Sequence, residues 1–378
     1  MNKIDDIKNI NYAKYLEDYS PSFVIEIYDN LKEYEYVIGN RITNPIKEAA
    51  TSNTLYDIAS LTKVFTSVLI YMAYEENKIS LEDTIYNIDN NFINLKEVKI
   101  IDLLSHNQNI LTNKYLGNIN SKEDFYNTLY TAYVKDNIPT YVDAHYIILG
   151  ILLEEIYNKS YDKLCQEKIF DVLGMKNTTF NPKKELCASN NYEHINGKII
   201  DNIYPGLVHD PKARSAKKYG LNLGHASIFT TGKDLLKFLE TFLNNRLLKK
   251  ETINLMLNHK NTNEENYKLL NNLTSEKDIN KAYSRAKEMN YDNLVSFTHN
   301  NMGVRYKNII DEINDIPNKA SDNSIVFSGY TGPAFTIDFD KKIIVLIMCN
   351  AIHNSKFNRH ERKAKRVEIM NMIFDKLV

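Results

Sequence analysis

The chain is poor in cysteine and has no long apolar run. Its 378 residues include only Cys165, Cys187 and Cys349, which lie far apart and form no C-x-x-C pair. This spacing excludes a disulfide-stapled domain and a zinc ribbon. The longest apolar stretches, such as residues 146–153, are too short to cross a bilayer. We therefore expect no transmembrane helix.

The sequence also lacks an excess of either charge. It has 47 Lys and Arg against 48 Asp and Glu, a net charge of −1. This balance disfavours a protein that mainly binds nucleic acid or an anionic membrane. The basic run at residues 359–366 (RHERKAKR) is accordingly interpreted as the solvated face of a helix. Residues 1–19 carry charges throughout and lack the apolar segment of a secretory signal, so we expect a cytoplasmic protein.

The chain does have enough apolar residues, 43%, to build a sizeable core. A polar amphipathic helix is predicted over the first ~20 residues, ending near Pro21. Residues 60–290 show mainly helical periodicity, with loops around 109–122, 181–219 and 261–276. Strands are predicted at 22–28, 35–40, 295–299, 302–306, 324–327, 334–339 and 343–349, and a last helix at 359–377.

The order of the predicted helices and strands along the chain predicts an α+β fold, in which strands from both ends of the chain meet in one antiparallel sheet. Two isolated hairpins would be only marginally stable, so they are expected to pair. The sheet region would comprise residues 1–56 and 291–378, flanked by the N- and C-terminal helices. Residues 57–290 would form a mainly helical insertion beside it.

The sharpest local motif is S-x-x-K at Ser60 and Lys63, where an apolar helical pattern begins. Residues three apart are neighbours on a helix, so the Lys63 amine can reach the Ser60 hydroxyl. A nearby base activates a serine nucleophile, and the backbone N–H groups of a helix start stabilise an oxyanion. The alternative is that Ser60 only caps the helix and Lys63 is a solvated charge.

Two further motifs follow in order. Tyr141-Val-Asp143 precedes an apolar helix, and Phe327-Ser328-Gly329 lies between two predicted strands. With S-x-x-K, these resemble the three motifs of the serine β-lactamase and penicillin-binding-protein superfamily. The resemblance is to its class C-like branch of D-amino-acid peptidases, amidases and esterases, and extends over residues 22–354. Segments similar to that branch lie at 98–106, 168–178, 208–213, 224–231 and 349–353.

The resemblance implies the β-lactamase/transpeptidase-like fold and assigns roles to several residues. Ser60 is implied to be the acylated nucleophile, and Lys63 the group that keeps it deprotonated. Tyr141 is implied to be the general base toward Ser60 and the general acid toward the leaving group, a role that needs a neighbouring cation such as Lys63. The backbone N–H groups of Ser60 and Tyr330 are implied to form the oxyanion hole. The alternative for Tyr141 is an aromatic side chain that packs in the core.

Two positions depart from the family pattern. Asp143 stands where Asn or Ser is common, and its carboxylate can hold Lys63 in the charged form. Phe327 replaces the Lys or His of the third motif, whose cation attracts a substrate carboxylate or tunes the Ser-Lys-Tyr network. Ser328 and Gly329 keep the rest of that motif. A phenyl ring cannot pair with an anion, so we expect neutral esters to be better substrates than penicillins or cephalosporins.

No metal or cofactor site is predicted. His106, His209, His225 and His353 show no H-E-x-x-H spacing, and are expected to cap loops or to bond to backbone. The chain also lacks a phosphate-binding loop and the G-x-S-x-G of α/β-hydrolases. The sequence thus predicts a serine hydrolase that acts on a small ester or a cell-wall-type peptide. A catalytically silent ligand-binding protein on the same scaffold is the alternative.

Overall fold

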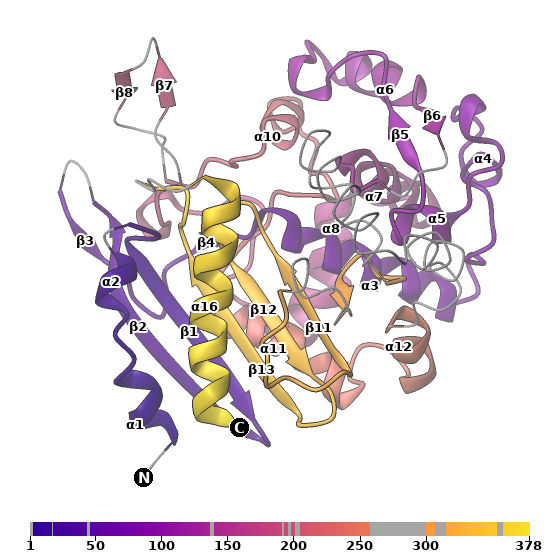
Figure 1. The fold of residues 1–378 in the computed structure, drawn as a ribbon. Helices are drawn as coiled ribbons and strands as arrows, with labels where there is room; N and C mark the ends of the chain where they lie inside the picture. The colour runs from indigo at the N-terminus through magenta and orange to yellow at the C-terminus, as the bar shows by residue number, and fades with distance from the viewer. Residues whose placement is uncertain are drawn as a thin grey trace, which may run out of the picture.

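A seven-stranded sheet lies at the centre of the fold in the computed structural model (Figure 1). The structure describes residues 3–16, 18–43, 46–136, 140–190, 193–195, 198–200, 205–257, 300–306, 315–353 and 358–378. The strands follow the order β10-β11-β12-β13-β1-β2-β3. They are β1 (Ser22–Asp29), β2 (Lys32–Ile42), β3 (Glu48–Ala49), β10 (Arg305–Tyr306), β11 (Ser324–Ser328), β12 (Ala334–Asp338) and β13 (Ile343–Cys349).

The two ends of the chain meet in this sheet, as predicted. β1 pairs antiparallel with β2 on one side and with β13 on the other, with Ile25 opposite Ile347. The predicted strand at 343–349 is confirmed, whereas β10 is shorter than the strand predicted at 302–306. The strand predicted at 295–299 and the loop predicted at 261–276 lie outside the described residues.

One face of the sheet is covered by helices from both ends of the chain, and the other by an internal helix. The side chains of β13 alternate between two apolar clusters, so this strand is buried on both faces. Val345 and Ile347 belong to the cluster of α16 (Arg359–Leu377), and Leu346 belongs to the cluster of α11 (Gly232–Asn244). Figure 1 shows α16 running across the sheet in front and α11 behind it.

The N-terminal segment was predicted to form one helix, and this prediction is wrong. The structure has two short helices, α1 (Lys3–Lys8) and α2 (Ala13–Leu16), with a break at residues 9–12, which include Asn9 and Asn11. Asn is a weak helix former because its side chain competes with the backbone for hydrogen bonds. The apolar side chains of this segment still pack on the sheet beside α16.

The helical region lies beside the sheet and packs around two long apolar helices, α3 (Thr62–Glu75) and α7 (Asp143–Tyr157). Its other helices are α4 (Ile85–Ile88), α5 (Ile100–Leu104), α6 (Lys122–Tyr130), α8 (Tyr161–Cys165), α9 (Asp171–Leu173), α10 (Pro211–Lys217) and α12 (Lys250–Leu257). Its described residues also form three small strand pairs: β4 (Tyr56–Asp57) with β9 (Phe229–Thr230), β5 (Asn109–Leu111) with β6 (Tyr133–Asp136), and β7 (Glu193–Ile195) with β8 (Lys198–Ile200).

Helix α10 was not expected, because residues 181–219 were predicted to be a loop. It begins at Pro211, and the Asp210 side chain caps it by accepting a hydrogen bond from the Ala213 N–H at 2.8 Å. Asp followed by Pro is a recognised helix start, so the sequence did carry this signal. Within the described part of the chain, no helix is both long and apolar enough to cross a membrane.

A buried carboxyl group lies where α11 meets the sheet. Glu26 on β1 is 2% exposed and is the cross-strand neighbour of Glu35 on β2. A Cβ atom on Gly232, the first residue of α11, would lie 2.6 Å from Glu26 Oε1, so the helix packs directly on this carboxyl group. Burial, and then the charge of Glu35, raise the pKa of Glu26 to about 9.

We expect the protein to lose stability as the pH rises toward 9, and Glu26→Gln to remove much of that loss. The folded-state pKa of about 9 lies above the unfolded value of 4.5. The stabilising contribution is therefore complete below pH 4.5 and is lost as the pH rises to about 9, by up to about 1.4 kcal/mol per pH unit. Urea unfolding at pH 6 and pH 8.5 measures this slope. Glu97→Gln, at an exposed loop position away from Glu26, is the control. Equal slopes in wild type and Glu26→Gln would contradict the assignment.

Candidate active site

Ser60 lies in a strained turn between the sheet and a buried helix. It is the middle residue of a 3₁₀ turn, Ala59–Leu61, which leads directly into α3. Ala59 has a φ of +45°, a left-handed conformation that costs energy for a residue with a side chain. The Asp57 carboxylate accepts a hydrogen bond from the Ala59 N–H at 2.8 Å and so holds this turn. The cap of α3 is Leu61, with no side-chain cap bond, so Ser60 is not its capping residue.

Lys63 extends from the first turn of α3 back to Ser60. Its Nζ lies 3.1 Å from Ser60 Oγ and 2.8 Å from Asp143 Oδ1. The side chain is 1% exposed, so it is not a solvated charge. Burial opposes the charge of the ammonium group, but the Asp143 carboxylate and then Tyr141 raise the pKa of Lys63 above its ordinary value. Lys63 is therefore a cation beside the Ser60 hydroxyl.

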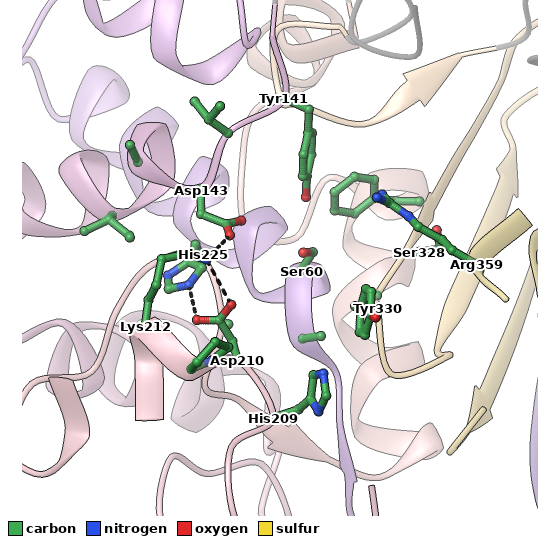
Figure 2. A pocket seen from close by; sticks show the side chains of 18 of the residues that line it. Ser60, Tyr141, Asp143, His209, Asp210, Lys212, His225, Ser328, Tyr330 and Arg359 are labelled. Atoms are coloured by element: carbon green, nitrogen blue, oxygen red, sulfur yellow. Dashed lines mark hydrogen bonds and ion pairs between the residues drawn. The ribbon is translucent and has the colours of Figure 1, made fainter. Parts of the chain in front are cut away.

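Tyr141 lies next to Ser60 and Lys63, just before α7. Figure 2 shows its hydroxyl pointing toward Ser60. The Lys63 Nζ lies 4.9 Å from the centre of its ring, within range of a cation–π contact. The ring packs 4.4 Å from His106 and 6.5 Å from Phe327, measured between ring centres. Tyr141 thus contacts the core with its ring and lines the cavity beside Ser60.

A buried histidine pair lies behind the Tyr141 ring. His106 Nδ1 and His145 Nδ1 are 2.8 Å apart, close enough to share one proton. Burial lowers the pKa of His145 to about 3, so this ring is neutral at physiological pH. The histidines were expected to cap loops or to bond to backbone; His225 instead bonds to the Asp210 carboxylate, and His353 Nε2 lies 3.0 Å from the Thr43 hydroxyl.

Asp143 belongs to a chain of alternating charges that the sequence did not reveal. Lys212 on α10 lies 2.9 Å from Asp143 Oδ2 and 3.4 Å from Asp210 Oδ2, and Asp210 Oδ1 lies 2.9 Å from His225 Nε2 (Figure 2). Although burial opposes its charge, Lys63 and Lys212 hold the pKa of Asp143 well below its usual range. The Lys212 ammonium therefore helps to balance the negative charge of Asp143.

The same cluster brings together atoms that are able to ligate a metal. Ligand atoms of Asp143, Asp210 and His225 lie within 4.8 Å of one another. The Lys212 ammonium already bonds to both carboxylates, and a metal ion would have to displace it. In this arrangement Lys212 supplies the cation that balances the two carboxylates.

The third motif forms the opposite wall of the site at the end of β11. A Cβ atom on Gly329 would lie 2.4 Å from the Ile58 carbonyl oxygen, so only glycine allows this close approach to the Ser60 turn. The Thr331 hydroxyl fixes the contact by donating to the Asp57 carbonyl oxygen at 2.6 Å. The Phe327 side chain is buried, Ser328 lines the cavity, and the half-exposed Tyr330 ring stacks on His209.

These walls enclose a cavity of about 830 Å³ that contains Ser60. Its lining brings together Ser60, Tyr141, Asp143, Phe327, Ser328, Gly329 and Tyr330 from distant parts of the sequence. The basic run on α16 also lines it, through Arg359, Arg362, Lys363 and Arg366. The interpretation of this run as a solvated helix face is wrong for Arg366, which is buried, whereas Arg359 borders the cavity and is still exposed to solvent.

Comparison with known proteins identifies the family to which the chain belongs. The sequence profile of the Beta-lactamase family matches residues 27–368. The chain belongs to the beta-lactamase family of serine hydrolases.

Individual relatives agree with this membership. A Salmonella typhimurium protein named "putative D-alanyl-D-alanine carboxypeptidase" is 26% identical over 235 residues, which are 54% of each chain. The chain thus spans about half the length of the curated relatives it matches. A mutant of simvastatin synthase from Aspergillus terreus shares the fold, with a TM-score of 0.70, 15% identity and coverage of 99% of this chain and 94% of that one. A class C beta-lactamase from Rhodobacter sphaeroides has a TM-score of 0.66 at 13% identity, covering 97% and 99%.

Replacing Asp143 by asparagine is expected to shift the acid limb of the kcat/KM profile toward lower pH. The negative charge of Asp143 raises the pKa of Lys63. Removing this charge lowers the pKa of the groups around Ser60, and with it the pH at which the acid limb falls. Initial rates of ester hydrolysis between pH 5 and pH 9 measure the limb. Asp375→Asn, at an exposed position far along α16, is the control and is expected to leave the profile unchanged. A limb that stays in place, or moves to higher pH, would contradict the role of Asp143.

Proposed function

We propose that this protein is a serine hydrolase that forms an acyl-enzyme on Ser60. The observation that carries the proposal is the 3.1 Å contact between Lys63 Nζ and Ser60 Oγ inside a cavity that Tyr141 also lines. Covalent catalysis generally needs a nucleophile, a polar group next to it, and a third group that holds this polar group in place. Here Asp143 is that third group, since it holds Lys63 at 2.8 Å.

In the proposed reaction, Ser60 Oγ attacks the substrate carbonyl carbon while its proton passes to Tyr141. Tyr141 acts in this step as the phenolate, and the Lys63 ammonium stabilises the negative charge of its oxygen until the proton of Ser60 arrives; the charge then lies on the oxyanion of the tetrahedral intermediate. The tetrahedral intermediate then breaks its bond to the leaving group, which takes the proton from Tyr141. Water hydrolyses the resulting ester of Ser60 by the reverse sequence of proton transfers.

The oxyanion of the intermediate is proposed to bind to the backbone N–H groups of Ser60 and Tyr330. The close approach of Gly329 to Ile58 and Ala59 supports this, because it sets the two stretches of backbone beside each other. Donors fixed before the reaction stabilise developing charge without reorganisation. The strained φ of Ala59 is consistent with a turn held for this purpose.

The proposed substrate is a small ester or a cell-wall-type peptide. The name of the Salmonella relative supports a D-amino-acid peptide, and the apolar Phe327 ring supports an ester. A p-nitrophenyl acetate assay tests the activity. We expect a burst of p-nitrophenol that is stoichiometric with the protein, followed by slower steady turnover. The absence of both burst and turnover, together with no hydrolysis of D-alanyl-D-alanine peptides, would reject the proposal.

A ligand-binding protein without catalysis is the second candidate, and one observation favours it. The Lys63–Asp143 ion pair keeps Lys63 charged, which removes Lys63 as a base for Ser60 and leaves the proton transfer to Tyr141 alone. The two candidates differ in a covalent product: only the hydrolase gains mass on Ser60 when it meets an activated ester or a fluorophosphonate.

A further inference from the structure

One buried carboxylate bonds to separate stretches of the chain around Ser60. Asp57 is the last residue of β4 and is 1% exposed. Its Oδ1 accepts a hydrogen bond from the Ala59 N–H at 2.8 Å, and its Oδ2 accepts one from the His209 N–H at 2.8 Å. The Asn190 amide also donates to Oδ2, at 3.2 Å. The proposed proton transfers do not involve this side chain.

The two oxygens of Asp57 are both acceptors at neutral pH. Burial raises the pKa of Asp57 to about 6, although the N–H groups of His209 and Ala59 favour the charged form. At pH 7.5 the group is therefore a carboxylate. Burying a charge costs free energy, and the three donors compensate for that cost here.

The bond to Ala59 fixes the first proposed oxyanion donor, the Ser60 N–H. Ala59 has a φ of +45°, and the bond from its N–H to Asp57 Oδ1 stabilises this strained conformation. Ser60 follows directly in the chain. The orientation of the peptide between Ala59 and Ser60, and with it the direction of the Ser60 N–H, therefore depends on the contact with Asp57.

The second proposed donor, the Tyr330 N–H, is connected to Asp57 in two ways. The Thr331 hydroxyl donates to the Asp57 carbonyl oxygen at 2.6 Å. His209, whose N–H bonds to Asp57 Oδ2, stacks its ring on the Tyr330 ring, with ring centres 5.2 Å apart and planes at 12°. Figure 2 shows the side chains of His209 and Tyr330 near Ser60.

We propose that Asp57 is the positioning residue of the oxyanion hole. One of its oxygens sets the turn that carries Ser60, and the other oxygen and the backbone carbonyl set the segment that carries Tyr330. Asp57 touches no reacting atom and acts through these two N–H donors. The inference rests on the proposed function, which places the oxyanion between them. A displacement of about 1 Å in such a site can slow a reaction about 10²-fold.

Asp57→Asn tests the proposal, because asparagine has only one acceptor oxygen. In the observed arrangement it can bond to the Ala59 N–H or to the His209 N–H, but not to both. The test measures labelling of the full chain by a fluorophosphonate at pH 7.5, as the maximal rate (kinact), the reagent concentration at half that rate (KI) and the final labelled fraction. We expect kinact to fall by about 10²-fold. KI and the final fraction of one label per chain should stay as in wild type.

Asp338→Asn on β12 is the matched control. Asp338 is also buried, and its two oxygens accept from the Ser321 N–H at 2.8 Å and from the Lys341 N–H at 3.0 Å. It loses one acceptor in the same way, but it does not belong to the described lining of the cavity. We expect Asp338→Asn to be labelled with wild-type kinact even where it is less stable.

Thr331→Val keeps the inference testable if Asp57→Asn does not fold. Valine keeps the shape of threonine and removes the hydroxyl that donates to the Asp57 carbonyl oxygen, so kinact should fall by about ten-fold.

The outcomes separate this inference from the proposed function. Wild-type kinact in the folded variants at Asp57 and Thr331, while wild type is labelled on Ser60, would overturn the inference alone. A slower reaction that comes only from a higher KI, or a smaller labelled fraction at unchanged kinact, would also overturn it. Those results would mean altered binding or partial unfolding instead of misplaced donors. A wild-type protein that is not labelled would reject the proposed function and this inference with it.

Discussion

Replacing Ser60 by alanine is expected to lower kcat/KM for ester hydrolysis by roughly 10⁴-fold or more, the scale on which deleting a serine nucleophile acts. The fold should survive, because the Ser60 hydroxyl caps no helix and the one bond that joins it to Lys63 leaves Lys63 with Asp143 and the His225 carbonyl as partners. Steady-state kinetics and urea unfolding of the same protein samples measure both effects.

The control for this substitution is Ser80→Ala, at an exposed loop position. It is expected to keep wild-type kinetics and to lose only the exposed hydrogen bond that the Ser80 hydroxyl accepts from the Glu82 N–H at 3.3 Å. Full esterase activity in Ser60→Ala would show that another group is the nucleophile. A variant that is inactive but also unfolded would instead show that the turn at Ala59–Leu61 is needed for the fold.

Replacing Tyr141 by phenylalanine is expected to slow acylation by about 10²–10⁴-fold, the range typical of a general acid–base group. The substitution deletes one hydroxyl and keeps the ring, so the packing against His106 and Phe327 is retained. Burst kinetics with a p-nitrophenyl ester separate acylation from the later hydrolysis step. The effect should therefore appear in the burst rate and leave the melting temperature nearly unchanged.

Tyr133→Phe, at an exposed position of β6, is the matched control. If Tyr141→Phe acylates as fast as this control, the hydroxyl takes no part in proton transfer and Tyr141 serves only to pack against the core.

The sheet could be predicted from the sequence because its strands are short apolar runs bounded by turns. The apolar run of β13 and the hairpin β1–β2 are both present, and α16 has the predicted bounds. The break in the N-terminal helix was harder to predict. The amphipathic pattern of this segment is continuous, but Asn9 and Asn11 lie where the helix is interrupted. Local propensity at two positions outweighed the periodicity there.

The site could be predicted only where its parts are close in sequence. Ser60 and Lys63 are one helical turn apart, so their contact follows from helix geometry. Lys212 lies 69 residues after Asp143, and no local pattern shows that α10 brings it to that carboxylate. No local pattern shows that Arg359 borders the cavity either, because its position there depends on how α16 packs on the sheet.

The central claim, an acyl-enzyme on Ser60, is tested most directly by mass spectrometry of the protein after reaction with a fluorophosphonate. We predict one adduct per chain, mapped by peptide digestion to Ser60, slowed in Tyr141→Phe and absent in Ser60→Ala. An unmodified wild-type protein, or an adduct on any other residue, would contradict the account.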